Sequence, residues 1–338
     1  MGNDDGSLLA ACLIVRNEER NIGRCLASLD GLVDQIKVVD TGSTDLTVTI
    51  AREFGAEVVS SPWTNDFSFH RNQVMDMATS KWILVIDADE SVVETDKEDT
   101  RTRLASGSLP EILMVREHLV YPGGKRLTVL APRLLARSSG IRYVHPIHEQ
   151  LDISDSRAML SNVTLLHHGY AATDRLMDKE RRNIEIARRM GEDSLHGLHS
   201  RARSALSIEA WEEVIECASA LLKRDPPSVL AVEACVLGGL ATCQAGDHEK
   251  CLWFLRRGKE IEPECSDLML IELVDAATRY RDLLAAEGDS RGQGAFVRPW
   301  MLWHDADQVS ALLDGLLGRR KVVVTAGPQS CPEGAGDS

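Results

Sequence analysis

Two aspartates separated by one residue follow a strongly apolar stretch of the chain. The segment Trp82–Glu90 reads WILVIDADE, so Asp87 and Asp89 come directly after residues that favour a buried strand. Alternate side chains of an extended segment share a face, and both carboxylates can therefore converge on one divalent cation or its bound water. The plain alternative is that these aspartates cap a helix or face solvent. Their place at the end of a buried strand favours the cation.

Asp40 ends another apolar run, in the segment KVVDTGSTD. A carboxylate at this place can accept hydrogen bonds from a base N–H or a sugar hydroxyl. Helix capping fits Asp45 better than Asp40, and Asp66 is expected to cap the helix that follows it. The sequence has no GxGxxG motif and no P-loop, so a glycine-rich phosphate cradle is not expected.

The elements that must position these acids alternate between apolar runs of strand length and helical segments. Strands buried on both faces and separated by helices predict an α/β fold with a mainly parallel sheet of βαβ units. Ligands of such sheets bind beyond the carboxyl ends of the strands, where Asp40 and Asp87 would lie. The expected strands are 8–15, 35–40, 56–61 and 81–87, and the expected helices are 17–29, 43–55 and 66–80. Residues 96–166 predict shorter, partly antiparallel strands that complete this domain.

The chain becomes helical after about residue 172. The segments 206–226 and 245–263 form a repeat whose closing prolines lie 37 positions apart. Small residues at the helix crossing, a Gly-Asp turn and a proline after the second helix resemble a tetratricopeptide repeat, whose period is about 34 residues. We therefore predict an all-α tetratricopeptide-like region that follows the α/β domain in the sequence.

Composition excludes several classes of partner. The 338 residues include 38 basic and 52 acidic side chains, and the net charge of -14 disfavours nucleic acid and anionic membranes. The eight cysteines form no CxxC pair, which indicates reduced thiols. The apolar run near the N-terminus is too short for a signal peptide or a membrane span. A cytoplasmic protein without a membrane span is expected, and its oligomeric state is left open.

Several motifs in order resemble the family 2 glycosyltransferases of GT-A fold. The segments that carry the resemblance are CLIVRNEERNIGRCL, VVDTGSTD, FSFHRNQVMDMATSKWILVIDADE and IHEQL, within residues 8–170. The likeness is strongest to a bacterial branch in which this domain precedes tetratricopeptide-like helices, a branch that includes peptide S-glycosyltransferases. It implies a metal-dependent inverting enzyme that moves a hexose from a nucleotide diphosphate sugar, expected to be a UDP-sugar. The implied acceptor is a peptide or protein side chain, with a small molecule as the alternative.

The sequence pattern, together with the resemblance for the first domain, predicts the domain boundaries. These are a GT-A nucleotide-sugar-binding catalytic domain over 1–171, a tetratricopeptide-like domain over 172–290, a C-terminal extension over 291–325 and a disordered tail over 326–338. Trp300 and Trp303 lie in an irregular part of the extension and are candidates for the acceptor site.

Site residues follow from the matching motif positions. Asp40 would contact the uracil or ribose, and Arg71 would lie near the base and phosphates. Asp87 would face the ribose and metal-bound water, while Asp89 would ligate Mn²⁺ or Mg²⁺ bridging the diphosphate. The base pocket would be lined by Val15, Asn17 and Glu18.

Histidines and a glutamate complete the implied site. The family spaces one motif as His-x-Gly-Tyr, so His167 is favoured as a further metal or diphosphate contact and His168 as its neighbour; both could instead be structural. An inverting transfer needs a base for the acceptor's proton. Glu149 is the candidate, with His148 as its orienter or the alternate base, although Glu149 could equally belong to a structural ion pair. Glu90 is the other carboxylate to be tested.

Two rival functions remain. The first is a non-catalytic scaffold or peptide-binding protein that retains a glycosyltransferase-like domain, against which the intact Asp40, Arg71, Asp87 and Asp89 argue. The second is a phosphohydrolase that uses the acids of DADES, but such enzymes place that motif after their first strand. Here the motif follows the fourth expected strand.

Overall fold

The computed structural model of the chain describes residues 6–120, 126–153, 158–168, 173–191 and 194–263. The chain divides into two compact units, Met1–Met190 and Gly191–Ser338. The division falls later than the expected boundary after residue 171, because helix α5 (Thr173–Arg188) packs in the first unit. Its Ile186 and Ala187 are buried in one cluster with Ile147. The expected regions 291–325 and 326–338, with Trp300 and Trp303, lie outside the described residues.

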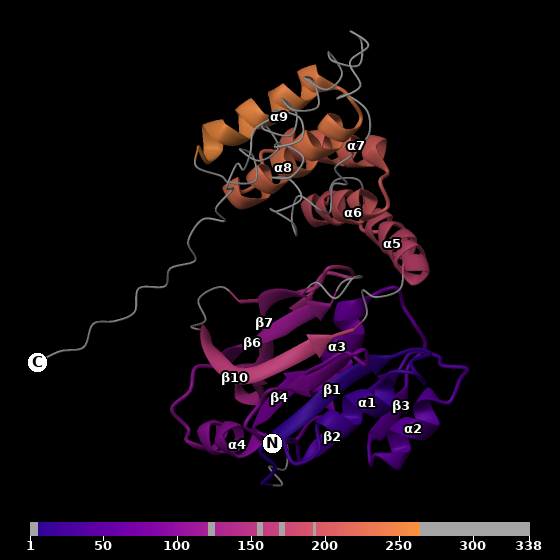
Figure 1. Cartoon of the computed structure of the whole chain (residues 1–338), viewed down its shortest axis with the longest axis vertical. Coiled ribbons are helices and arrows are strands. Elements are labelled where there is room, and N and C mark those ends of the chain that lie inside the picture. Colours follow the sequence, from indigo (N-terminus) through magenta and orange to yellow (C-terminus); the bar gives the residue numbers. More distant parts are fainter. Residues whose placement is uncertain (1–5, 121–125, 154–157, 169–172, 192–193, 264–338) are drawn as a thin grey trace, which may run out of the picture. The chain divides into compact units, whose positions relative to one another are not determined.

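The first unit is built on a mixed sheet with the strand order β3-β2-β1-β4-β7-β6-β10-β5 (Figure 1). The first four of these strands run parallel, and they are β1 (Leu9–Val15), β2 (Gln35–Asp40), β3 (Glu57–Ser60) and β4 (Trp82–Val85). The others are β5 (Glu90–Val93), β6 (Ile112–Val120), β7 (Arg126–Ala136) and β10 (Ala158–His167). A small second sheet pairs β8 (Tyr143–Val144) with β9 (Gln150–Leu151). The α/β fold expected from the sequence is confirmed.

Helices cover both faces of the sheet because its central strands are apolar on both sides. Leu9, Ala11 and Leu13 of β1 lie in one buried cluster, whereas Ala10 and Cys12 lie in another. The first cluster includes side chains from α1 (Ile22–Ser28), α2 (Thr47–Glu53) and α4 (Lys97–Ala105), and the second includes side chains from α3 (Phe67–Asp76). Burial on both faces explains the unbroken apolar runs of these strands.

The local signals at the helix ends are partly confirmed. Asp66 caps α3, since its side chain accepts a hydrogen bond from the backbone N–H of Phe69 at 2.9 Å. The helix expected over 17–29 begins only at Ile22, because Asn17 has a φ of 56° and cannot belong to a right-handed helix. Residue 17 instead belongs to the turn that leaves β1.

The described residues of the second unit, 194–263, form consecutive helices. These are α6 (Leu195–Ser207), α7 (Trp211–Leu222), α8 (Ser228–Gln244) and α9 (His248–Ile261), and α6–α7 and α8–α9 form hairpins. Gly238 of α8 allows the two helices of the second hairpin to approach each other closely. A Cβ at this position would lie 2.4 Å from ring carbons of Phe254 on α9. The small residues of the expected repeat therefore stand at a real helix crossing, and the prediction of helices behind the α/β domain is confirmed.

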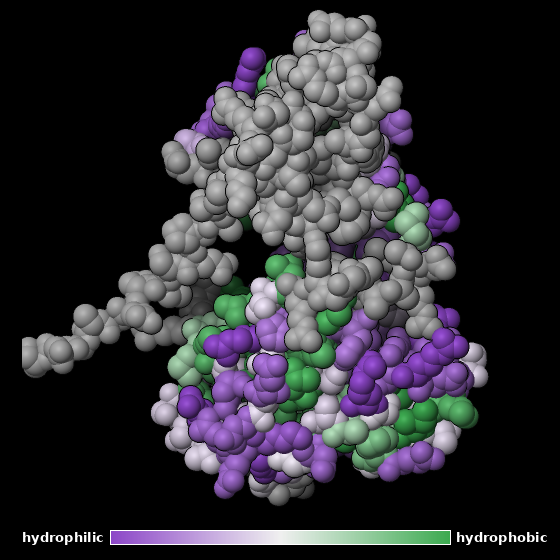
Figure 2. Space-filling view, viewed as in Figure 1, coloured by the Kyte–Doolittle hydropathy of each residue, from purple (hydrophilic) through white to green (hydrophobic). Residues whose placement is uncertain are grey.

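The surface of the first unit and the burial of the cysteines agree with what the composition predicts. Figure 2 shows hydrophilic and hydrophobic residues interspersed over the visible face of the first unit. Within the described ranges, no helix combines the length and apolar character needed to cross a membrane. The cysteines described there are buried, as expected for small core residues.

Gly238→Ala tests the helix crossing in the second unit. Gly→Ala in a helix normally stabilises by about 0.5–1 kcal/mol, but overpacking against a buried ring costs about 1–3 kcal/mol. We expect a net loss of stability, measured as a lower midpoint in thermal or urea unfolding. Gly23→Ala in α1 is the matched control, because its new Cβ would meet its nearest atom at 3.7 Å. A Gly238→Ala protein as stable as Gly23→Ala would contradict this packing.

Candidate active site

The acidic loop after β4 lies at the carboxyl edge of the parallel strands. Asp87 and Glu90 hold the loop through two reciprocal hydrogen bonds: the N–H of Asp87 donates to Glu90 Oε2 at 2.8 Å, and the N–H of Glu90 donates to the Asp87 carbonyl at 3.0 Å. Glu90 then begins β5 with a fully buried side chain. The loop conformation therefore depends on a buried carboxylate beneath it.

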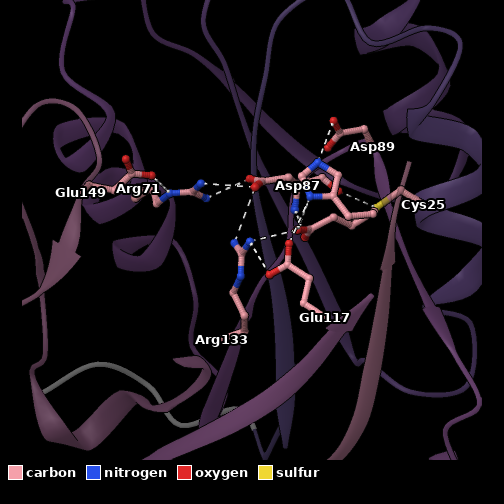
Figure 3. Close-up of polar contacts among 9 residues, drawn as sticks. Cys25, Arg71, Asp87, Asp89, Glu117, Arg133 and Glu149 are labelled. Carbon is pink, nitrogen blue, oxygen red and sulfur yellow. Dashed lines mark hydrogen bonds and ion pairs between the residues drawn. The ribbon is translucent and has the colours of Figure 1, made fainter. Parts of the chain in front are cut away.

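Asp87 is held by two arginines that approach it from different elements (Figure 3). Arg71 of α3 donates from Nη2 to Asp87 Oδ2 at 3.4 Å, and its Nη1 lies 3.0 Å from Oδ1 outside hydrogen-bond geometry. Arg133 Nη1 lies 3.5 Å from Oδ2. Burial by itself would raise the pKa of Asp87, but the two guanidinium groups hold it well below its usual value. Asp87 is therefore ionised and balanced by protein cations.

Arg133 has no counterpart among the residues expected from the sequence. Leu113 pairs with Leu134 and Met114 pairs with Pro132, so Arg133 is the extra residue of a β-bulge in β7. Bulges redirect side chains, and proline inside a strand is typical of them. Pro132 within an apolar run was the available sequence signal.

Arg133 joins three carboxylates in the interior. Besides Asp87, its Nη2 lies 2.9 Å from Glu90 Oε1 and 3.4 Å from Glu117 Oε2. Burial opposes the charge on Arg133, but these carboxylates raise its pKa well above the usual value. Burial also raises the pKa of Glu90 to about 8, although Arg133 opposes that rise. The sequence left the role of Glu90 open. In the structure, its side chain supports the acidic loop.

Asp89 and His167 meet at the end of this network. His167 Nε2 lies 3.2 Å from Asp89 Oδ2, and His167 Nδ1 lies 3.1 Å from Glu117 Oε1. Burial would lower the pKa of His167, but its contacts with the two carboxylates raise it to about 10. His168 lies beside the pair and contacts Ser91 Oγ through Nε2 at 3.2 Å.

One pair among these residues is suited to bind a divalent cation. In the part of the chain that the structure describes, Glu90, Glu117 and His167 have possible ligand atoms within 4.8 Å of one another. Both of those carboxylates are bonded to Arg133, however, which already supplies their positive charge. Among the residues that the structure describes, no arginine is bonded to Asp89, which lies next to the imidazole Nε2. A carboxylate oxygen and an imidazole nitrogen are suitable ligands for Mn²⁺, so Asp89 and His167 are the pair that fits.

The residues expected to line the nucleotide pocket lie at the ends of β1 and β2. Val15 and Asp40 are register partners, and Asp40 Oδ1 accepts a hydrogen bond from the N–H of Ser43 at 3.1 Å. Asn17 donates its N–H to Ser43 Oγ at 2.9 Å, and Glu18 donates its N–H to a side chain of α2, Thr47 Oγ1, at 2.7 Å. The structure thus brings Val15, Asn17, Glu18 and Asp40 together.

Glu149 lies on the other side of Arg71 from Asp87 (Figure 3). Arg71 Nε donates to Glu149 Oε1 at 2.7 Å, and the Glu149 side chain is 15% exposed. This contact is the ion pair that the sequence allowed as an alternative to a base. Its neighbour His148 has a left-handed backbone with a φ of 48°. The base role of either residue stays a prediction.

Arg133→Met tests the charge balance of the site. Removing one partner of a buried ion pair costs about 3–5 kcal/mol, because the remaining carboxylates lose their compensating charge. We expect a loss of this order in the free energy of unfolding, measured by urea denaturation.

Arg142→Met is the matched control, since its ion pair with Asp76 lies on the surface. Exposed pairs contribute about 0–1 kcal/mol, so this variant should unfold close to the wild-type midpoint. Equal midpoints for the two variants would refute the importance of Arg133.

Comparisons with known proteins show what part of this chain is similar to. Residues 11–105 match the model of glycosyl transferase family 2. A TPR repeat-containing protein of Synechococcus elongatus is 38% identical over 146 residues, which cover 43% of this chain and 36% of the relative. The glycosyltransferase SunS of Bacillus subtilis is 29% identical over 201 residues, which cover 55% of this chain and 46% of the relative. The chain thus spans less than half the length of these relatives.

A solved structure was also matched, that of Staphylococcus aureus TarS 1-349 in complex with UDP-GlcNAc. It has a TM-score of 0.42 and 12% identity, and the match covers 83% of this chain and 92% of that chain. The family match, by contrast, includes Asp40, Arg71, Asp87 and Asp89. The α/β unit that carries these residues is therefore similar to glycosyl transferase family 2 over residues 11–105.

Proposed function

We propose that this protein is a metal-dependent inverting glycosyltransferase that moves a hexose from a UDP-sugar to an acceptor. One observation carries the proposal: Asp89 Oδ2 and His167 Nε2 lie 3.2 Å apart at the carboxyl edge of the family 2 domain. They would hold Mn²⁺ or Mg²⁺, which offsets the charge of the diphosphate leaving group when bound. A relative named as a glycosyltransferase, 29% identical to this chain, supports the same reaction class.

The remaining residues would bind and orient the donor. Asp40 would accept a hydrogen bond from the base or ribose, and the Ser43 N–H holds its carboxylate in place. Val15, Asn17 and Glu18 would line the base pocket. Asp87, kept ionised by Arg71 and Arg133, would accept from the ribose hydroxyls or from metal-bound water. Arg71 would add positive charge near the phosphates.

The acceptor and its base are the less constrained part of the proposal. Helix hairpins like α6–α7 and α8–α9 favour a peptide or protein acceptor, with a small molecule as the alternative. Glu149 is proposed as the base, with His148 as its orienter or the alternate base. The ion pair of Glu149 Oε1 with Arg71 would orient that carboxylate. The buried thiols in the described ranges favour a reducing compartment, so we propose a cytoplasmic location.

Binding of UDP should depend on a divalent cation and on Asp89. In calorimetric titrations, we expect UDP to bind with Mn²⁺ and to lose at least about tenfold in affinity with EDTA or in Asp89→Ala, since about 1.4 kcal/mol is tenfold. Asp30→Ala is the matched control, because this exposed aspartate lies far along the chain from the acidic loop. It should bind as the wild type does.

A transfer assay with the same protein distinguishes the proposed enzyme from the rival non-catalytic scaffold. Incubation with UDP-hexose, Mn²⁺ and cell extract should add the mass of one hexose to an acceptor. Absence of metal-dependent UDP binding by the wild type would refute the transferase. Binding of UDP without transfer to any acceptor and without slow hydrolysis of the donor would favour the non-catalytic scaffold.

A further inference from the structure

We propose that Glu117 is a positioning residue that holds the His167 imidazole with Nε2 directed at Asp89. The inference rests on the proposed function, in which Asp89 and His167 bind the metal. Glu117 lies on β6, within a segment that carries none of the expected motifs. Its role is therefore separate from those implied by the sequence.

The geometry of the imidazole supports this assignment. Glu117 Oε1 lies 3.1 Å from Nδ1, and Asp89 Oδ2 lies 3.2 Å from Nε2. The two ring nitrogens point in different directions, so a partner at Nδ1 sets both the ring orientation and the availability of Nε2. Metal-binding histidines commonly use a carboxylate in this way. The contact joins neighbouring parallel strands, since Leu165 of β10 is the register partner of Glu117.

Glu117 is itself fixed in place. Its side chain is buried, and its other oxygen, Oε2, lies 3.4 Å from Arg133 Nη2. Each carboxylate oxygen therefore has its own partner, an imidazole on one side and a guanidinium on the other. A group fixed at both oxygens has little freedom to rotate, which suits it to orient a neighbour.

Glu90 is the competing carboxylate, and distance rules it out. Its Oε1 lies 3.9 Å from His167 Nδ1, beyond hydrogen-bond range, and 2.9 Å from Arg133 Nη2. Glu90, Glu117 and His167 also form a possible ligand group for a metal. Their contacts are better explained by a role in supporting the acidic loop and His167 than by a metal site. A cation between these carboxylates would have to displace the Arg133 guanidinium from both.

Manganese binding by a double-mutant cycle tests the proposal. With UDP at saturation, Glu117→Met should weaken Mn²⁺ binding by about 10–100-fold, as loss of such a partner does at other metal sites. Met fills a similar volume but cannot accept from Nδ1. His167→Ala should also weaken binding, and Glu117→Met should add little in that background because both changes remove one interaction.

A spectroscopic measurement of the metal-free protein gives an independent readout. The Nδ1–H proton of His167 should exchange slowly with water in ¹H–¹⁵N spectra of the wild type, and this protection should be lost in Glu117→Met. Glu180→Met is the matched control, because it removes another buried glutamate, which lies on α5 and accepts a hydrogen bond from Asn183 Nδ2 at 3.2 Å. It should change neither the His167 signal nor, beyond about threefold, the Mn²⁺ affinity.

The outcomes distinguish this inference from the function on which it rests. Wild-type protein that binds no Mn²⁺ with UDP would refute the proposed function, whereas the Nδ1–H signal would still report the Glu117 contact. Wild-type affinity in Glu117→Met together with a loss in His167→Ala would overturn the positioning role alone. Where circular dichroism shows that Glu117→Met does not fold, Glu117→Asp replaces it. Its shorter reach should weaken binding several-fold without adding to His167→Ala, and additive losses would overturn the inference.

Discussion

The compensation of buried negative charge by Arg133 is the constraint on which the rest of the site depends. Asp87, Glu90 and Glu117 all lie within 3.5 Å of its guanidinium nitrogens. Desolvation and mutual repulsion oppose the ionisation of neighbouring carboxylates. Contacts that include Arg133 lower the pKa of Asp87 and of Glu117, whereas burial still raises the pKa of Glu90 to about 8. The arginine allows Glu90 to lie under the acidic loop and to hold the Asp87 backbone. The loop in turn directs Asp89 toward His167.

The two aspartates of the loop are consequently in different electrostatic surroundings, although one residue separates them. Asp87 is balanced by Arg71 and Arg133, which the protein itself supplies. The partner of Asp89 is the His167 imidazole. Asp89 is therefore the carboxylate that is suited to bind a cation together with that imidazole. Under the proposed function, the same motif would provide one carboxylate for permanent protein charges and one for an exchangeable cation. A binding site needs this difference, because a carboxylate committed to two guanidinium groups is poorly placed to coordinate a metal.

The chemistry and the helical hairpins depend on different kinds of packing. The α/β unit places polar side chains at strand ends, where side chains from several elements converge on one edge. The α8–α9 hairpin instead relies on close approach of apolar and small residues, as Gly238 beneath Phe254 shows. Helix pairs of this type build extended surfaces for partners, whereas the sheet edge can enclose a small charged ligand. The chain correspondingly divides into two compact units that differ in their packing.

The sequence by itself determined the features that arise from local patterns. Apolar runs predicted β1, β2 and β4, Asp66 was recognised as a helix cap, and the strand ends located Asp40, Asp87 and Asp89, because each signal lies within a few consecutive residues. Only the tertiary structure decided the partners of these groups. Arg71 meets Glu149 across 78 positions, and Glu117 meets His167 across 50. Arg133 reaches Glu90 across 43 positions from a bulge. Strand register and a shift in that register select the pairs of Glu117 and Arg133, whereas the packing of α3 against β8 brings Arg71 to Glu149. None of these features is visible in the local pattern of charged and apolar residues.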